Sequence, residues 1–294
     1  MAMSQRIGQD SKGNSVFVLD GNGNSTGVLN HDLNEIADAY IDFLSGNEHQ
    51  KSEYIFTIKK SEVKDHININ PQHYSPKLNA ALDSVLAFDN KDNWATTTVG
   101  QLEAGIRIYI GPRWNSASIK VDNPTDTSNL VPYLTANAAL ELRRFTVKWL
   151  DARKANPQQR QCIDMLKIHE GDILISRSGT IGKVTYATKD LAENYIVSDD
   201  LVRIRVKDAN LRAYLLAYFT SSTALALMLL DEYGSVQQHL QPRHIQEMLI
   251  PVPDDWSLAQ DMIDAGNMFI KAMEDMSKAD RKIRTQGFDA LIAE

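Results

Sequence analysis

A regular spacing of apolar residues near the C-terminal end limits what this chain can fold into more than any other feature. The intervals alternate between four and three residues over more than three heptads. The residues at these positions are Leu258, Met262, Ala265, Phe269, Ala272, Met276, Ala279 and Ile283. Such a repeat predicts one long helix with an apolar seam along one face.

The seam has one row of small residues and one row of mostly large ones. Ala265, Ala272 and Ala279 form the small row, so a second helix could approach closely along it. We predict that the seam pairs with a partner helix; the alternative is that the helix packs only on its own domain. Gly266 lowers the stability of the helix by about 1 kcal/mol relative to alanine.

The stretch GDILISRSGTIGKV, residues 171–184, contains glycines, hydroxyls and cations in close succession. A phosphate-binding P-loop needs a glycine five positions before the Gly-Lys pair and a Ser or Thr after the lysine. Arg177 and Val184 occupy those positions, so the P-loop interpretation fails. The pattern predicts a β-hairpin with strands over 172–176 and 181–186. Its tip then carries Arg177, Ser178, Thr180 and Lys183.

The same stretch lies in the basic part of an acidic chain. The formal net charge is −7, yet residues 141–189 contain ten Lys and Arg against five Asp and Glu. This block is suited to an anionic polymer such as DNA, although a charge run is also common on a solvated face.

Length and composition favour a globular protein with a core of considerable size. The chain has 294 residues, 43% of them hydrophobic. No apolar run reaches 18 residues and residues 1–13 contain no apolar secretory segment, so we expect a cytoplasmic protein without a membrane partner. Cys162 is the single cysteine and the histidines show no metal-ligand spacing, so neither a metal nor thiol chemistry is expected.

The middle of the chain alternates strand-like and helical runs. Strands are expected over 106–110 and 196–206, and a helix over 211–230. This alternation predicts an α+β (mixed α/β) fold. We divide the chain into an N-terminal segment (1–94), a mixed domain (95–253) and the heptad helix (254–294).

The order of several motifs resembles the target recognition domain and conserved helix of type I restriction-modification specificity subunits. The motifs are VPYLTANAAL (131–140), KIHEGDILISRSGTIGKV (167–184), IVSDDLVRIRV (196–206), YLLAYFTSS (214–222) and YGSVQQHLQPRHIQEMLIPVP (233–253), followed by the heptad helix. Such subunits usually contain two recognition domains and two antiparallel helices. This sequence shows one set, which implies a half-sized subunit that pairs with a second copy. Residues 1–94 resemble the junction between an adenine-N6 methyltransferase and a recognition module.

The resemblance implies a non-catalytic DNA-recognition role. It places phosphate or base contacts at Arg177, Ser178, Thr180 and Lys183. It also places base contacts at Gln237, Gln238 and His239, for which a plain surface loop is the alternative. Nonspecific attraction would come from Arg143, Arg144, Lys148, Arg153 and Lys154. The strings NPQH, NPTD and NPQQ lack the second proline of an adenine methylase motif, so no methylation by this chain is expected.

The resemblance also implies partners. Double-stranded DNA, a methyltransferase (M) subunit, a restriction (R) subunit and a second copy of this chain are expected, with S-adenosylmethionine, ATP and Mg used by the partner subunits and no cofactor here. Two alternatives stay open: the specificity subunit of a combined type II system, and an α/β enzyme that binds a phosphorylated small molecule through residues 177–184.

Overall fold

The computed structural model describes residues 17–19, 25–29, 33–47, 76–102, 105–141, 147–179, 181–229 and 239–286. The chain divides into two compact units, Met1–Ala80 and Ala81–Glu294. Residues 81–94 therefore fall within the second unit and not with the N-terminal segment expected over 1–94. Among the described helices, none is long and apolar enough to cross a bilayer.

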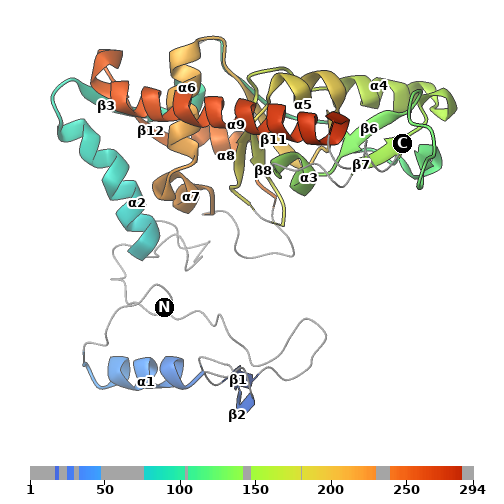
Figure 1. Ribbon diagram of the computed structural model, residues 1–294. Helices are drawn as coiled ribbons and strands as arrows, with labels where there is room; N and C mark the ends of the chain where they lie inside the picture. The colour runs from blue at the N-terminus through green and yellow to red at the C-terminus, as the bar shows by residue number, and fades with distance from the viewer. Residues whose placement is uncertain are drawn as a thin grey trace. The chain divides into compact units, whose positions relative to one another are not determined.

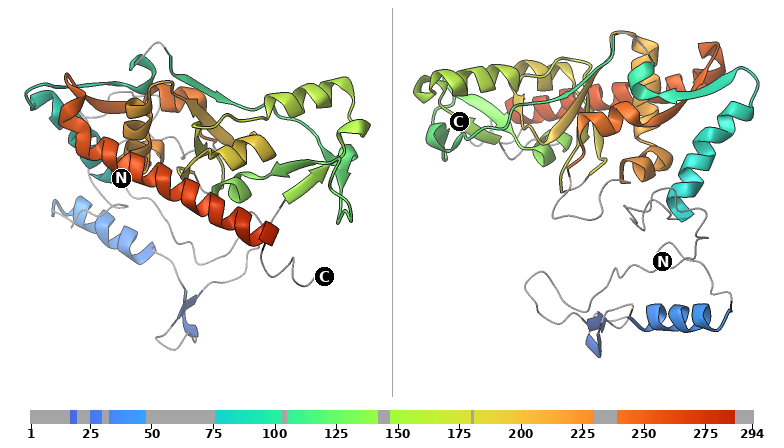
Figure 2. Two further views of the ribbon diagram at one scale, coloured as in Figure 1. Left: turned by 45° about the horizontal axis from the view of Figure 1, so that its top comes forward. Right: turned by 180° about the vertical axis from the view of Figure 1, so that it is seen from behind.

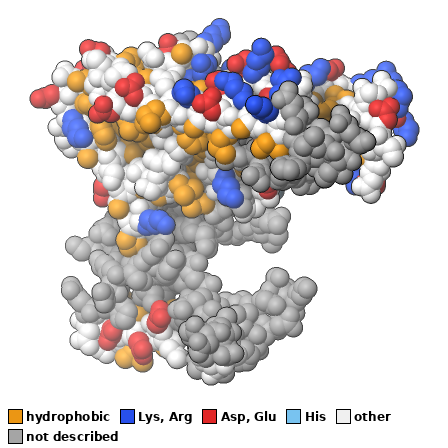
Figure 3. All heavy atoms as spheres, viewed as in Figure 1, with side chains coloured by type: hydrophobic (Ala, Val, Ile, Leu, Met, Phe, Trp, Pro, Cys, Tyr) orange, Lys and Arg blue, Asp and Glu red, His pale blue; other side chains and the backbone are white. Residues whose placement is uncertain are grey.

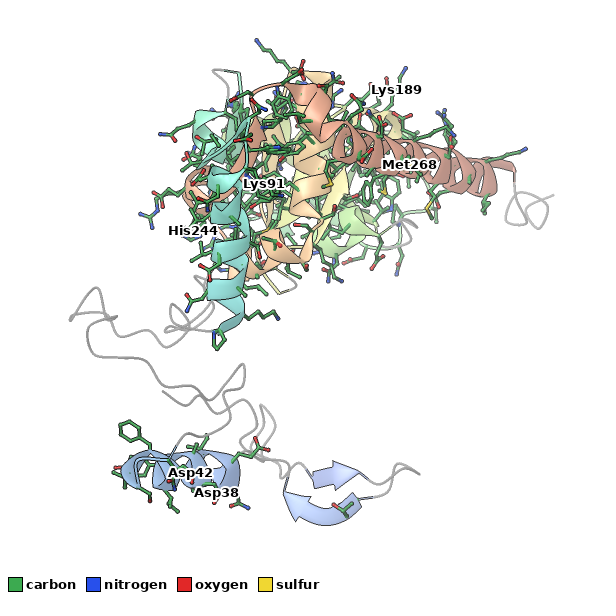
Figure 4. All side chains as sticks on the ribbon, turned by 90° about the vertical axis from the view of Figure 1, so that its left-hand side faces the viewer. Asp38, Asp42, Lys91, Lys189, His244 and Met268 are labelled. Atoms are coloured by element: carbon green, nitrogen blue, oxygen red, sulfur yellow. The ribbon has the colours of Figure 1, made fainter. Side chains whose placement is uncertain are left out.

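The described residues of the first unit include a short antiparallel ribbon and the helix α1 (Figure 1). Strand β1 (Phe17–Leu19) pairs with β2 (Ser25–Leu29), and α1 spans Leu33–Leu44. Asp38 and Asp42 lie on α1 (Figure 4). Tyr40, Ile41 and Phe43 on the same helix are exposed.

The second unit contains three sheets among its described residues. The strands are β3 (Trp94–Thr98), β4 (Arg107–Ile110), β5 (Lys120–Val121), β6 (Val131–Leu134), β7 (Val147–Leu150), β8 (Ile173–Ser176), β9 (Val184–Tyr186), β10 (Ile196–Val197), β11 (Leu201–Arg205) and β12 (Leu249–Pro253). Their orders are β4-β11-β8-β9, β10-β6-β7-β5 and β12-β3. The parallel pair β10-β6 among otherwise antiparallel neighbours makes the second sheet mixed.

Helices alternate with these strands along the chain, which confirms the mixed α/β class (Figures 1 and 2). They are α2 (Pro76–Leu86), α3 (Ala136–Leu140), α4 (Pro157–Met165), α5 (Lys189–Asn194), α6 (Ala209–Phe219), α7 (Ser222–Met228), α8 (Pro242–Glu247) and α9 (Gln260–Gln286). Short 3-10 turns lie at Ala87–Asn90, Val99–Gln101, Ala117–Ile119, Ala152–Lys154 and Trp256–Ala259.

The core joins the two larger sheets. One buried cluster contains Leu134 of β6, Leu174 of β8 and Leu201 of β11, with Ala138 of α3 and Leu191 of α5. Because β8 is one strand of the 171–184 hairpin, its packing in this cluster holds the hairpin on the core. A second cluster, with Leu150 and Leu166, fills the space between the β6-β7 pair and α4.

The helix expected over 211–230 is interrupted, so this prediction was wrong in its continuity. Helix α6 ends at Phe219, and α7 begins at Ser222. The Ser221 side chain accepts a hydrogen bond from the Ala224 backbone N–H at 3.1 Å and caps α7. Serine is favoured at the N-cap position because its hydroxyl accepts a hydrogen bond from an otherwise unpaired amide of the first turn.

The long C-terminal helix is present as α9 and crosses α6 closely (Figure 1). A Cβ atom placed on Gly266 would collide with the Ala213 carbonyl oxygen. Further along, Ser277 Oγ lies 3.2 Å from Thr188 Oγ1, the cap of α5. Glycine at 266 is therefore required for the crossing, although it lowers intrinsic helix stability.

Candidate nucleic-acid interface

The hairpin predicted from the sequence is present. Strands β8 and β9 pair antiparallel, with Ile173 opposite Tyr186 and Ile175 opposite Val184. At the closing end, the Ser176 N–H donates to the Lys183 carbonyl at 2.9 Å, and the Gly182 N–H donates to the Ser176 carbonyl at 3.1 Å. Lys183 is exposed at the tip and Ser178 is half-buried. Among its described residues, the tip therefore presents the Lys183 cation and the Ser178 hydroxyl.

A buried ionic cluster holds the base of the hairpin. The Asp172 carboxylate, fully buried, accepts hydrogen bonds from Arg205 Nε at 2.8 Å and Arg205 Nη2 at 3.0 Å. The His169 N–H and the Tyr109 hydroxyl also donate to it, at 3.0 and 3.3 Å. Burial and the Asp172 carboxylate raise the pKa of Tyr109. The cluster ties β4 and β11 to the start of β8.

Helix α7 supports the tip from one side. The backbone of Gly182 has φ +80° and lies so close to α7 that a Cβ atom would be 2.5 Å from Leu225 Cδ1. Gly179 also has a positive φ, +72°, but nothing lies within 4 Å of its Cβ position. The two glycines of the tip therefore have different roles: both shape the turn, and Gly182 also permits close packing.

Arg177 does not point from the hairpin tip toward solvent as the sequence analysis expected. Its side chain is buried, with 3% exposure for the residue. Its Nε donates to the Leu240 carbonyl at 3.2 Å, and the Leu240 N–H donates to the Arg177 carbonyl at 2.9 Å. Burial lowers the pKa of Arg177, and the nearby Arg113 cation acts in the same direction. In this structure Arg177 is therefore not available for the expected DNA contact.

These bonds bring two expected DNA-contacting segments together. His239 precedes Leu240 in the chain, so it lies next to the hairpin although it is separated from Arg177 by 62 positions. His239 is half-buried, and its Nδ1 has no hydrogen-bond partner within the described residues. Five other expected contacts, Arg143, Arg144, Thr180, Gln237 and Gln238, lie outside the described residues.

The remaining expected cations lie on and after β7. Lys148 is exposed on β7, with Nζ 5.9 Å from the centre of the Tyr133 ring. Arg153 and Lys154 follow in a 3-10 turn and both approach Asp151, at 2.8 and 3.9 Å. The hydrogen bonds from Arg153 lower the pKa of Asp151. Part of the charge of these two cations is thus offset by a carboxylate beside them.

Arg113 is a candidate that the sequence analysis missed. It is exposed and follows β4, which pairs with β11, and its charge contributes to the lowered pKa of the buried Arg177 guanidinium. Beside it in the chain, Trp114 packs edge-on against Tyr133 with ring centres 6.2 Å apart. The motif GPRWN after a strand was the available signal, but one arginine outside the basic block carries little weight in a charge count.

A model of the type I restriction modification DNA specificity domain matches residues 110–263. The match extends over just over half of the chain and includes the hairpin, the Asp172–Arg205 pair at its base and the start of α9. The chain belongs to this family.

Several solved structures resemble this specificity-domain chain at low sequence identity. The HsdS subunit from Thermoanaerobacter tengcongensis has 16% identity and a TM-score of 0.41, with 73% of this chain and 48% of that chain covered. The S subunit of a type I system from M. genitalium has 13% identity and a TM-score of 0.41, covering 66% and 44%. The type IIG restriction endonuclease BpuSI has 14% identity and a TM-score of 0.45, covering 80% and 33%.

This chain spans about half the length of the two S subunits that it matches. Comparison with curated proteins gives no match.

Proposed function

We propose that this chain reads a DNA sequence and directs a partner adenine-N6 methyltransferase and a restriction subunit to it. The family membership supports this proposal, because the matched model is that of a DNA specificity domain and it includes the β8–β9 hairpin. Ser178 and Lys183 lie at the hairpin tip, and His239 precedes Leu240, which is hydrogen-bonded to Arg177 of the same tip. These three side chains suit phosphate and base-edge contacts. Lys148, Arg153 and Lys154 add nonspecific attraction.

The exposed seam of α9 is the proposed contact with a second copy of the chain. The helix packs on its own unit through a neighbouring face, where Ile263, Gly266, Ser277 and Asp280 are buried. The seam residues on α9 are left outside: Met262 is 41% exposed, Met276 44% and Ile283 59%. Leu258, which was expected to begin the helix, lies in the 3-10 turn before α9 and is 49% exposed. Apolar side chains in such a row favour coverage by another helix.

The same face is visible in the figures. Figure 3 shows hydrophobic side chains among charged ones on the side of the second unit where Figure 1 draws α9. Met268 also projects from α9 (Figure 4) and is 73% exposed, which widens the apolar stripe beyond the predicted seam.

The charges along α9 favour an antiparallel pair of copies. Asp261 and Asp264 lie in its first turns, whereas Lys278, Arg281 and Lys282 lie near its end. Antiparallel pairing brings the acidic part of one helix to the basic part of the other, and parallel pairing brings like charges together. A two-fold dimer of this kind would read a bipartite, palindromic target.

The partner subunits would supply the chemistry in this proposal. Methyl transfer needs S-adenosylmethionine, and translocation and cleavage need ATP and Mg, which we assign to the M and R subunits. This chain would recognise the target sequence and set the spacing of the two half-sites.

The salt dependence of binding tests the DNA-recognition proposal against a small-molecule role of residues 177–184. We expect duplex DNA to bind with an affinity that falls linearly on a log-log plot against salt, with a slope near −0.9 per phosphate contact. Titration of a fluorescent duplex between 50 and 300 mM salt, roughly the range in which such slopes are measured, gives this value. A thermal shift with sugar phosphates or nucleotides and none with duplex would contradict the proposal.

A further inference from the structure

Arg177 connects three segments that are far apart in the sequence. Its backbone N–H donates to the Asp200 carbonyl at 3.2 Å, in the turn before β11. Its carbonyl accepts from the Leu240 N–H at 2.9 Å, ahead of α8. Its guanidinium reaches the Leu240 carbonyl through Nε at 3.2 Å and the Asp199 carbonyl through Nη1 at 3.5 Å. One residue thus fixes the hairpin tip to both neighbours.

The contacts require the branched shape of a guanidinium. Two different N–H groups of one side chain reach carbonyls on two segments. The compact ammonium of lysine carries the same charge but lacks the planar fork that serves both positions. Because Arg177 is buried, water cannot replace a hydrogen bond that its side chain loses. Each lost bond therefore leaves a backbone carbonyl without a donor.

We propose that Arg177 is a positioning residue that holds the hairpin tip against the Leu240 segment, so that Ser178, Lys183 and His239 form one DNA-contacting surface. Arg177 itself does not touch the DNA. The effect on DNA binding rests on the proposed DNA-recognition function. The hydrogen bonds of Arg177 to the 199–200 and Leu240 segments, which we call the clamp, are a property of the free protein.

Hydrogen exchange of the free protein tests the clamp directly. In Arg177→Lys we expect faster amide exchange in peptides that contain residues 178–183 and 239–241, while α9 peptides exchange as in the wild type. The Leu240 amide loses its hydrogen bond to the Arg177 carbonyl when the hairpin tip moves away, so it exchanges faster. Arg113→Lys is the matched control, because it changes an exposed neighbouring arginine in the same way and should leave exchange unchanged. Unchanged exchange in Arg177→Lys would overturn the clamp.

Binding to DNA tests the consequence. The probes are a duplex enriched from a randomised library by the wild-type chain and a scrambled duplex of the same length. We expect Arg177→Lys and Arg177→Ala to lower the preference for the enriched duplex at least tenfold, with an unchanged salt slope. A direct phosphate contact would behave differently: lysine would preserve binding, and alanine would reduce the slope by about 0.9. That second pattern would overturn the positioning role.

The two measurements separate the inference from the proposed function. If the wild-type chain shows no preference among duplexes, the proposed function fails, and hydrogen exchange still decides whether Arg177 acts as a clamp. If exchange is faster in Arg177→Lys but the sequence preference is retained, DNA recognition stands and the positioning role is contradicted.

Discussion

Gly179 and Gly182 have similar positive φ values within the hairpin tip but different surroundings, so they can be used to separate backbone strain from packing. A side chain at either position is strained by φ alone, at a cost of about 1–2 kcal/mol. At Gly182 the new Cβ would also collide with Leu225 Cδ1, whereas at Gly179 it would meet nothing within 4 Å.

We therefore expect Gly182→Ala to lower the free energy of unfolding by about 1 kcal/mol more than Gly179→Ala does. Urea unfolding of the two variants measures the difference. Adding Leu225→Ala to Gly182→Ala should remove part of the excess, because the clashing methyl is gone. Equal losses in the two glycine variants would show that α7 does not support the tip.

Lys183 is the cation that the hairpin tip exposes, and a phosphate contact there has a defined signature. Lys183→Ala should weaken binding to all duplexes by a similar factor and reduce the salt slope by about one unit. Lys271→Ala on α9, which removes an exposed lysine paired with Asp275, is the control and should leave the slope unchanged. Fluorescence anisotropy at several salt concentrations measures both. A loss confined to the enriched duplex would indicate base reading instead.

At the scale of elements, the crossing of α6 and α9 determines whether Gly266 is replaceable. Alanine would favour an isolated helix by about 1 kcal/mol. In this protein the added methyl would overlap with the Ala213 carbonyl group. We therefore expect Gly266→Ala to lower the free energy of unfolding by about 2 kcal/mol or more. Asn267→Ala, one residue further on an exposed position, should be neutral or slightly stabilising. A stabilised Gly266→Ala variant in thermal unfolding would contradict the close crossing.

The exposed seam gives a second prediction for α9. Ala272→Arg places a charged side chain in the small row and should convert a dimer into a monomer while the thermal unfolding of the unit is unchanged. Asn267→Arg adds the same side chain at an exposed position on another face of the helix and should leave the dimer intact. Light scattering gives both masses. An Ala272→Arg protein with the mass of the wild type would exclude the seam as the interface.

The sequence predicts α9 and the β8–β9 hairpin well, because each depends on local periodicity and turn residues. It predicts less about which side of an element is covered. The heptad spacing identifies an apolar face, yet the buried face of α9 includes Gly266, Ser277 and Asp280, which no hydrophobic pattern selects. Likewise Arg177 resembles a DNA-contacting residue in the sequence, and only the distant Leu240 segment explains its burial. Contacts between segments far apart in the chain determine both which face of α9 is buried and the burial of Arg177.

At the scale of the whole molecule, the described part of the second unit carries the proposed DNA-contacting surface at the hairpin tip and the exposed seam of α9. A single surface of this kind would read one half-site, and two copies joined through antiparallel α9 helices would hold two half-sites at a fixed separation. Sequence recognition and self-association are therefore, in this proposal, parts of one function.

Selection from a randomised duplex library tests both the sequence recognition and the pairing of two copies. The full chain is used at moderate salt, alone and with its methyltransferase partner, and the retained duplexes are sequenced. We expect two short, inverted half-sites at one fixed spacing, and Ala272→Arg should reduce the selected sequence to a single half-site. Retention without any enriched sequence would contradict the account, since it would leave nonspecific attraction as the whole of the interaction with DNA.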